Sequence, residues 1–207
     1  VRENTFVLYT SDNGSFMRRQ NDTSQRDHVD DESIQAYSSN RHRANGVFRG
    51  TKADIWEAGH HVPFLVRWLK HTTPGSECDT TVCLTDVFAT VASIVGKEMP
   101  KGAGPDSFSF QPNLHLAALK VLRPPVIHHS SAGIFAIRIG DAKLVLGNGS
   151  GGREAPKGKP FQKPYQLFNL RDDIGETKNI IESNKAEAEA LEKGALLIRD
   201  NEGQCRR

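Results

Sequence analysis

The strongest constraint in this sequence is a short apolar run that ends abruptly in turn residues. Residues 6–10 read Phe-Val-Leu-Tyr-Thr, and Ser-Asp-Asn-Gly follows directly at residues 11–14. An apolar run of this length, bounded by turn residues, predicts a buried central strand of an α/β sheet. Ligands of such sheets bind beyond the carboxyl ends of the strands, so we expect Asp12 and Asn13 to lie where a site belongs.

Asp12 and Asn13 have the chemistry of ligands for a hard metal ion. One side chain supplies a charged carboxylate and the other a neutral amide oxygen, a mixture that suits Ca²⁺ or Mg²⁺ better than a soft metal. Asp-Asn-Gly is also an ordinary turn sequence. Taken alone, this stretch therefore leaves a turn without function as the alternative.

A second informative stretch reads Phe-Arg-Gly-Thr-Lys-Ala-Asp-Ile-Trp-Glu-Ala-Gly-His-His-Val-Pro at residues 48–63. Its lysine, Lys52, is a candidate for binding an anionic oxygen, because an ammonium group is a compact charge with three donors. A lone lysine is usually solvated, so the frame of residues around Lys52 carries this interpretation. We expect Trp56 and Glu57 to pack and orient the loop rather than to react.

Taken in order, these motifs resemble those of the sulfatase family, particularly its arylsulfatase-like bacterial members in the alkaline phosphatase superfamily. The resemblance continues through residues 83–90, 128–130 and 167–179 and covers essentially the whole chain. It corresponds to only the C-terminal half of such an enzyme. The implied fold class is α/β: part of an alkaline-phosphatase-like sheet with flanking helices, plus a small C-terminal antiparallel sheet with one helix.

The resemblance also implies an activity and roles for individual residues. The activity is hydrolysis of sulfate esters by a sulfuric ester hydrolase that uses formylglycine and one Ca²⁺ ion. Asp12 and Asn13 match the metal ligands, and Asp12 is also able to hydrogen-bond the nucleophile, which makes it a catalytic candidate. Lys52 matches the lysine that binds the substrate sulfate and is the second catalytic candidate.

His60 and His61 complete the candidate site as substrate-binding residues. Related sequences typically show an arginine where His61 stands. A histidine at that position can donate to a carboxylate, but it matches the charge of arginine only when it is protonated. The role of that arginine is therefore open in this chain.

The nucleophile of the family arises from a cysteine or serine in a Cys-x-Pro-Ser-Arg type motif. The three cysteines, Cys78, Cys83 and Cys205, stand in other contexts and show no Cys-x-x-Cys or zinc-site spacing. We therefore expect the nucleophile in a missing N-terminal half, which would be the partner of this chain. The chain alone is expected to be inactive, to bind Ca²⁺ weakly, and to expose apolar surface that makes it poorly soluble.

Two alternatives to a sulfatase remain open. The first is a phosphoester hydrolase of the same superfamily. Members with two zinc ions generally place a histidine after the aspartate of the strand, where Asn13 stands here, and asparagine is a poor zinc ligand. The second is a non-catalytic truncated fragment that binds a partner or a sugar. Sulfated sugars, sulfated steroids and small aryl sulfates are all compatible with the motifs as substrates.

Composition excludes some classes of partner. The net charge of +2 over 207 residues is too small to indicate binding to nucleic acid or to an acidic membrane surface. The apolar runs all fall well short of the ~20 residues needed for a membrane span. For the full-length protein, the family resemblance implies a periplasmic or extracellular location.

The change to short strand-like runs after about residue 124, together with the resemblance, predicts two parts. Residues 1–122 would come from the catalytic α/β domain, and residues 123–207 would form a small α+β subdomain. In the first part, a polar loop over 15–47 would cover the pocket. A helix would begin at Thr85 and end at Gly96, packing on the sheet through one apolar face: Leu84, Phe88, Val91 and Val95. A further short helix is expected over 115–122.

The second part is expected to form four strands and a final helix. The strand candidates cover 126–130, 134–139, 143–146 and 166–170, with a hairpin turn at Gly140 and Asp141. The helix is expected over 183–199, with an apolar stripe made by Ala188, Leu191, Ala195 and Ile198. His128 and His129 are expected to be structural histidines whose hydrogen bonds are satisfied.

Overall fold

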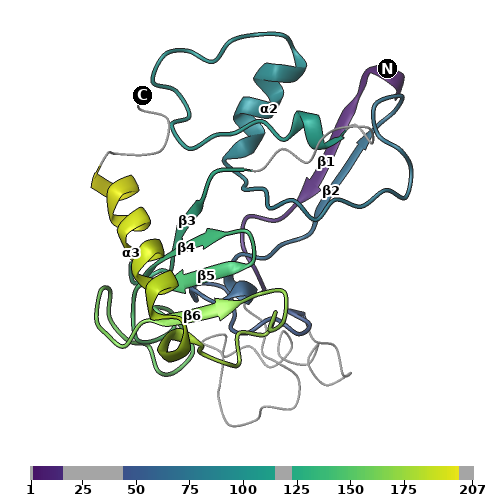
Figure 1. The fold of residues 1–207 in the computed structure, drawn as a ribbon. Coiled ribbons are helices and arrows are strands. Elements are labelled where there is room, and N and C mark those ends of the chain that lie inside the picture. The colour runs from purple at the N-terminus through teal and green to yellow at the C-terminus, as the bar shows by residue number, and fades with distance from the viewer. Residues whose placement is uncertain (1, 16–43, 115–122, 201–207) are drawn as a thin grey trace. The chain divides into compact units, whose positions relative to one another are not determined.

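The computed structural model describes residues 2–15, 44–114 and 123–200, which form two compact units interleaved along the chain (Figure 1). Unit 1 contains the described residues of 1–10, 63–126 and 193–207, and unit 2 contains those of 11–62 and 127–192. The domain boundary that we placed after residue 122 stays a prediction. The expected loop over 15–47 and the helix over 115–122 fall almost entirely outside the described residues.

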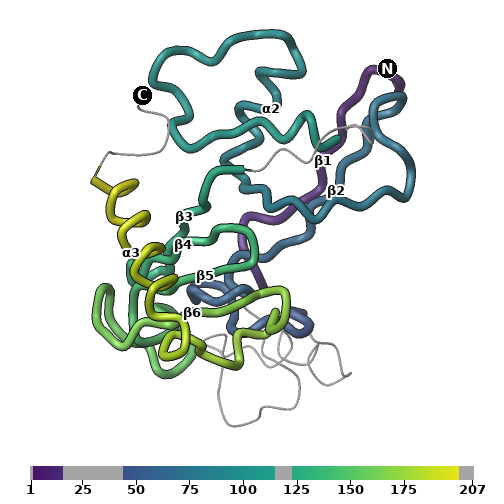
Figure 2. Tube along the Cα trace, in the orientation of Figure 1, coloured from purple at the N-terminus to yellow at the C-terminus, as the bar shows by residue number. Residues whose placement is uncertain are grey.

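Unit 1 is built around an antiparallel pair of strands, β1 (Phe6–Thr10) and β2 (Phe64–Trp68), as Figure 2 shows. The strand at residues 6–10 is confirmed, but its burial differs from the prediction. Val7 is 43% exposed and Tyr9 63% exposed, so the face of the β1–β2 pair on which they lie is open to solvent. The aromatic rings of Phe6 and Trp68 meet edge to face on the other face of the pair, with centroids 5.8 Å apart.

The helix α2 (Asp86–Ile94) begins and ends where the sequence indicates, with Gly96 at a positive φ of 63° just after its end. Its packing was predicted incorrectly. The expected apolar face is largely exposed: Leu84 37%, Phe88 48%, Val91 45% and Val95 60%. The buried face carries Asp86, Ala89 and Thr90 instead.

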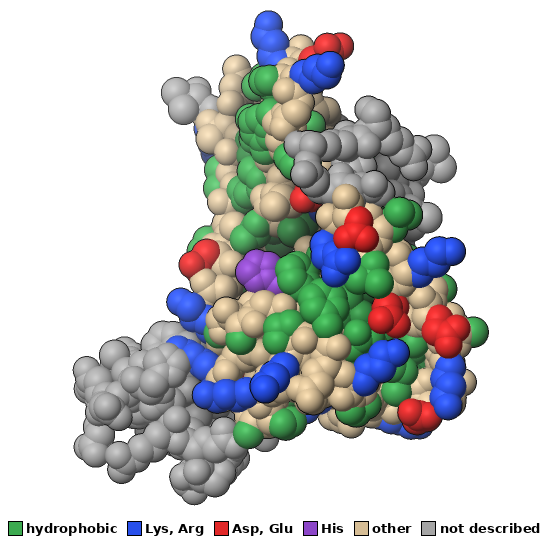
Figure 3. Space-filling view, turned by 90° about the vertical axis from the view of Figure 1, so that its left-hand side faces the viewer, with side chains coloured by type: hydrophobic (Ala, Val, Ile, Leu, Met, Phe, Trp, Pro, Cys, Tyr) green, Lys and Arg blue, Asp and Glu red, His purple; other side chains and the backbone are tan. Residues whose placement is uncertain are grey.

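Apolar side chains therefore reach the surface of unit 1 from both α2 and the strand pair. Figure 3 shows hydrophobic side chains among the polar ones on the face of the molecule that it presents. The expected exposure of apolar surface is confirmed for the described residues, while the solubility of the chain stays a prediction.

The carboxylate of Asp86 organises the region around the start of α2. It accepts hydrogen bonds from the backbone N–H groups of Cys83 at 2.8 Å and Phe108 at 3.0 Å. Its two oxygens also bind the guanidinium of Arg123, at 2.6 Å from Nε and 2.9 Å from Nη2. Thr85 precedes the helix as predicted, but its hydroxyl donates to the carbonyl of Asp106 rather than capping the helix.

Unit 2 contains a four-stranded sheet in the order β3-β4-β5-β6. The four predicted strands are confirmed: β3 (Val126–His129), β4 (Phe135–Ile139), β5 (Ala142–Val145) and β6 (Gln166–Asn169). The hairpin is confirmed as well, since Ile139 pairs with Ala142 and Gly140 adopts a φ of 58°. The final helix α3 (Lys185–Asp200) buries its predicted positions Ala188, Leu191 and Ala195.

The stretch before β2 packs onto this sheet rather than onto the strand pair of unit 1. Ile55 and Trp56 are fully buried and join a core with five residues of the sheet and its following turn: Ile134, Ala136, Val145, Phe168 and Leu170. The Ile55 N–H donates to the carbonyl of Ser150 at 2.8 Å. Short 3-10 turns complete the described elements: η1 (Arg2–Asn4), η3 (Glu57–Gly59), η4 (Gln111–Leu114) and η5 (Ile181–Ser183). In the described part of the chain, no helix is both long and apolar enough for a membrane crossing.

Replacing Arg123 by methionine tests the importance of the buried pair in unit 1. Arg123→Met leaves the Asp86 carboxylate buried without its counter-charge, so the free energy of unfolding should fall by about 3 kcal/mol. Lys70→Met is the matched control, because Lys70 pairs with Glu3 at 2.7 Å with both side chains largely exposed, and it should cost less than about 1 kcal/mol. Chemical denaturation measures both, and equal losses would contradict the assignment.

Candidate functional site

Two backbone hydrogen bonds join the turn of Asp12 and Asn13 to the loop of Lys52. The Lys52 N–H donates to the carbonyl of Ser15 at 3.0 Å, and the Gly14 N–H donates to the carbonyl of Gly59 at 3.0 Å. The approach is so close at Gly14 that a Cβ atom there would lie 1.6 Å from the Ala58 carbonyl oxygen. Stretches about forty residues apart in sequence are therefore side by side at the backbone.

The candidate side chains on these two stretches are available to a ligand. Asp12 and Lys52 are exposed and Asn13 is half-buried. Asp12 Oδ1 has the Ser11 hydroxyl at 3.5 Å, whereas the Lys52 ammonium has no hydrogen bond or ion pair with any described residue. That the three side chains converge on one anion stays a prediction.

The donor set fits a hard cation but is incomplete. Asp12 and Asn13 offer one carboxylate and one amide oxygen, which Ca²⁺ accepts, but Ca²⁺ takes about six to eight oxygen ligands. Across residues 2–15, 44–114 and 123–200, no group of three or more His, Cys, Asp or Glu side chains is placed to hold a metal ion. The described residues could therefore supply only part of a calcium site.

The Lys52 loop is held at its start by the buried carboxylate of Asp54. Oδ2 accepts a hydrogen bond from the Thr51 N–H at 2.8 Å. Oδ1 accepts from the backbone N–H groups of Arg153 at 2.6 Å and Glu154 at 3.2 Å. The bond to Thr51 closes the loop around Lys52, and the bonds to Arg153 and Glu154 attach the loop to the segment that follows β5.

Glu57, in η3, holds the other end of the loop and is 1% exposed. Its Oε1 lies 3.0 Å from Lys143 Nζ and 3.2 Å from His60 Nε2. Its Oε2 lies 2.9 Å from His61 Nδ1 and 3.3 Å from Arg138 Nη1. Glu57 is thus packed among these groups, as expected of a residue that orients the loop, and the histidine at position 61 contacts a carboxylate.

The histidines differ in their exposure and in their remaining nitrogen atoms. His61 is exposed, and its ring stacks on Phe48 with centroids 4.1 Å apart. His60 is half-buried, and its ring lies 4.0 Å from that of His128. In both His60 and His61 one ring nitrogen is used by Glu57. Their contact with a substrate stays a prediction.

The charges of this cluster shift the pKa values of its members. Burial by itself raises the pKa of Glu57, but the Lys143 charge and the hydrogen bonds from His60 and His61 outweigh it and hold that pKa far below its usual value. Burial, with the Lys143 charge, lowers the pKa of His60 to about 4. The cluster therefore favours an ionised Glu57 beside a neutral His60.

His128 was predicted incorrectly as a satisfied histidine. Both of its ring nitrogens are buried without a hydrogen-bond partner among the described residues. Burial lowers its pKa well below the usual value, because a charged imidazolium would lose its hydration. His129 is exposed and its Nδ1 lies 2.9 Å from the Ser130 carbonyl oxygen, as expected for a structural residue.

Sequence reasoning did not identify Lys143, Arg138 and Glu176 as partners of the loop. Lys143 lies on β5 and is fully buried, and its Nζ also contacts Glu176 Oε1 at 2.8 Å. The sequence shows a lysine at the start of the apolar run over 143–146. A lysine at such a position is often exposed, so its burial could not be inferred from the sequence. Pairing between residues 86 and 119 positions apart leaves no local pattern in the sequence.

Comparison with known proteins places these features in a family context. Residues 1–97 match the family model described as Sulfatase. The steryl-sulfatase of Mus musculus is 34% identical over 134 residues, which cover 65% of this chain and 19% of that protein. An N-acetylgalactosamine-6-O-sulfatase of Bacteroides thetaiotaomicron is 31% identical over 107 residues, which cover 52% of this chain and 19% of that protein. The chain thus spans about a fifth of the length of these relatives.

Solved structures give the same indication for the fold. A structure from work on glycosaminoglycan metabolism by Bacteroides thetaiotaomicron matches with a TM-score of 0.76 at 24% identity, covering 96% of this chain and 39% of that chain. A protein crystallised with a neocarrahexaose matches with a TM-score of 0.68 at 23% identity, covering 99% of this chain and 38% of that chain. These matches confirm the predicted fold class, α/β with part of an alkaline-phosphatase-like sheet and a small C-terminal antiparallel sheet.

The buried histidines should make the stability of the chain depend on pH. Because the folded state resists protonation of His128, stability should fall as the pH drops below the ordinary histidine pKa of about 6.5. His128→Phe should reduce that slope between pH 6.5 and 4.5 by up to about 1.4 kcal/mol per pH unit. Denaturant titrations at several pH values measure the slope.

His129→Phe is the matched control, because it changes the neighbouring histidine, which is exposed. It should leave the pH dependence as in the parent chain. An unchanged slope in His128→Phe, or equal changes in the two variants, would contradict the role of burial.

Proposed function

We propose that this chain, whose residues 1–97 match the family model described as Sulfatase, forms the C-terminal portion of an enzyme that hydrolyses sulfate esters. The observation that supports this most directly is the junction between the Asp12–Gly14 turn and the Lys52 loop. It brings a carboxylate, an amide and an ammonium that pairs with no described residue onto neighbouring stretches of backbone. A sulfate ester offers anionic oxygens both to a cation held by the first two groups and to the third.

Each of the three residues has a distinct task in this proposal. Asp12 and Asn13 present oxygen atoms to one Ca²⁺ ion, and Asp12 also accepts a hydrogen bond from the nucleophile. Lys52 donates to an oxygen of the sulfate group. As the bond between sulfur and the bridging oxygen breaks, charge accumulates on oxygen, so a fixed ammonium stabilises the transition state more than the ground state.

The remaining groups lie outside the described residues in this proposal. A hydrated formylglycine in a preceding segment would supply the attacking oxygen, and the calcium ion would neutralise the sulfate. None of the cysteines stands in the motif from which formylglycine arises. The chain's own contribution is to bind and orient the sulfate, which requires the turn and the Lys52 loop to be held rigidly.

The substrate class is proposed to be a sulfated sugar or an aryl sulfate. One structural neighbour was obtained in complex with its substrate D-glucosamine-2-N,6-O-disulfate. His61 is exposed near the start of β2 and His60 precedes it, so both are proposed to contact the organic part of the substrate. Among the described residues, no contact favours a phosphoester hydrolase over a sulfatase, and the test below separates the two.

Substitution of Lys52 tests the proposed activity in the longest natural polypeptide that contains this sequence. Lys52→Ala should lower kcat/KM for an aryl sulfate by about 10²–10³-fold, the usual cost of removing one transition-state donor. Lys159→Ala is the matched control, because Lys159 is exposed in the loop after β5, and it should leave the rate unchanged. Faster turnover of an aryl phosphate than of an aryl sulfate by the parent protein would instead favour the phosphoester hydrolase.

The 207-residue chain by itself should show no turnover of an aryl sulfate and only weak binding of Ca²⁺. The reason is that two ligands cannot form a site that needs about six to eight oxygens. A chromogenic assay measures the first and calorimetric titration with calcium the second. Appreciable turnover by this chain alone would show that the nucleophile does not reside elsewhere.

A further inference from the structure

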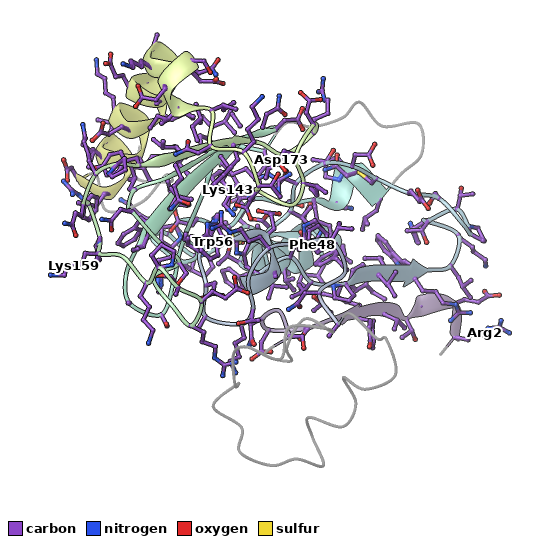
Figure 4. The ribbon with its side chains drawn as sticks, turned by 90° about the horizontal axis from the view of Figure 1, so that it is seen from below. Arg2, Phe48, Trp56, Lys143, Lys159 and Asp173 are labelled. Carbon is purple, nitrogen blue, oxygen red and sulfur yellow. The ribbon has the colours of Figure 1, made fainter. Side chains whose placement is uncertain are left out.

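Lys143 is a fully buried cation that joins the C-terminal sheet to the Lys52 loop. It projects from β5, and its Nζ lies 3.0 Å from Glu57 Oε1 and 2.8 Å from Glu176 Oε1. Glu176 Oε2 in turn accepts a hydrogen bond from the Glu57 N–H at 2.6 Å. Figure 4 shows Lys143 and Trp56 inside unit 2, whereas Lys159 points outward.

Stability alone does not explain this arrangement. One buried ammonium and two buried carboxylates lose their hydration, and apolar residues of similar volume often stabilise a fold as well or better. What the ion pairs add is a fixed orientation of Glu57. Both carboxylate oxygens of Glu57 are occupied, so its side chain and backbone have one orientation relative to β5.

Glu57 lies in the stretch that presents Lys52. On one side of Glu57, the Lys52 N–H donates to the carbonyl of Ser15, directly after the Asp12–Gly14 turn. On the other side, the Gly59 carbonyl accepts from the Gly14 N–H. Asp54 anchors the beginning of the stretch, and Glu57 anchors its end. A shift at Glu57 would therefore be transmitted to both bonds of the junction.

We propose that Lys143 is a positioning residue: through Glu57 and Glu176 it holds the Lys52 loop against the turn of Asp12 and Asn13. The four-stranded sheet then sets the geometry of a site to which it contributes no ligand. That this site binds a sulfate ester rests on the proposed function. The positioning itself is a property of the chain that is measurable without any activity.

The test compares residue-by-residue amide hydrogen exchange, followed by NMR, in the 207-residue chain and its variants. Lys143→Met removes the ammonium and keeps the length of the side chain. The amides of Lys52 and Gly14 should then exchange at least about tenfold faster relative to the amides of the β4–β5 ladder, because local opening speeds exchange only in the segment that opens. Lys159→Met is the matched control and should change neither.

A second variant keeps the test decisive if Lys143→Met unfolds. Lys143→Met combined with Glu57→Gln and Glu176→Gln removes all three fully buried charges together, so that of the ion pairs made by Glu57 only Arg138, whose side chain is 21% exposed, loses its counter-charge. It should fold and still show faster exchange at Lys52 and Gly14 than at the ladder. Exchange that rises equally at the loop and the ladder in both variants, or that does not rise, would overturn the proposal.

Failure of this proposal is distinguishable from failure of the proposed function. If Lys52→Ala leaves aryl sulfate turnover unchanged in the longer polypeptide, the assignment of Lys52 fails. The exchange of the Lys52 and Gly14 amides still reports whether Lys143 positions the loop. Conversely, equal exchange at loop and ladder would remove the role of Lys143 and leave the assignment of Lys52 intact.

Discussion

The buried ion pair between Glu57 and Lys143 is the interaction on which the geometry of unit 2 depends. It links a loop that precedes β2 to a strand 86 residues later in the chain. Both charges are removed from water, so each requires the other, and the hydrogen bonds of His60, His61 and Arg138 complete the coordination of Glu57. The candidate site residues are thereby attached to the C-terminal sheet through a carboxylate that does not itself belong to the site.

The ion pair between Glu57 and Lys143 lies in the same unit of the chain as the candidate site residues. The turn of Asp12 and Asn13 and the loop of Lys52 both belong to unit 2, whereas β1 and β2, which flank them in sequence, belong to unit 1. Unit 1 leaves apolar side chains exposed on α2 and on the strand pair. Surfaces of this kind commonly mark interfaces, and the structural match that covers 96% of this chain covers only 39% of the neighbouring protein's chain.

The contacts of Glu57 show what a histidine at position 61 supplies. An arginine at position 61 would bring a permanent charge to Glu57, whereas His61 brings a hydrogen bond that is available without a charge. Glu57 already has Lys143 and Arg138 as cationic neighbours. The carboxylate is therefore compensated without a third permanent cation, which is consistent with a neutral His60 beside it.

Local patterns in the sequence determined the elements of this protein. The strand at residues 6–10, the start and end of α2, the β4–β5 hairpin and the stripe of α3 all follow from apolar periodicity and glycine positions, because these act over a few residues. Motif order also indicated the family. Only the tertiary structure decided which face of α2 is buried, that the ring nitrogens of His128 find no hydrogen-bond partner among the described residues, and that Lys143 meets Glu57. These outcomes depend on contacts between residues far apart in the chain, and desolvation and charge pairing act through space without leaving a period in the sequence.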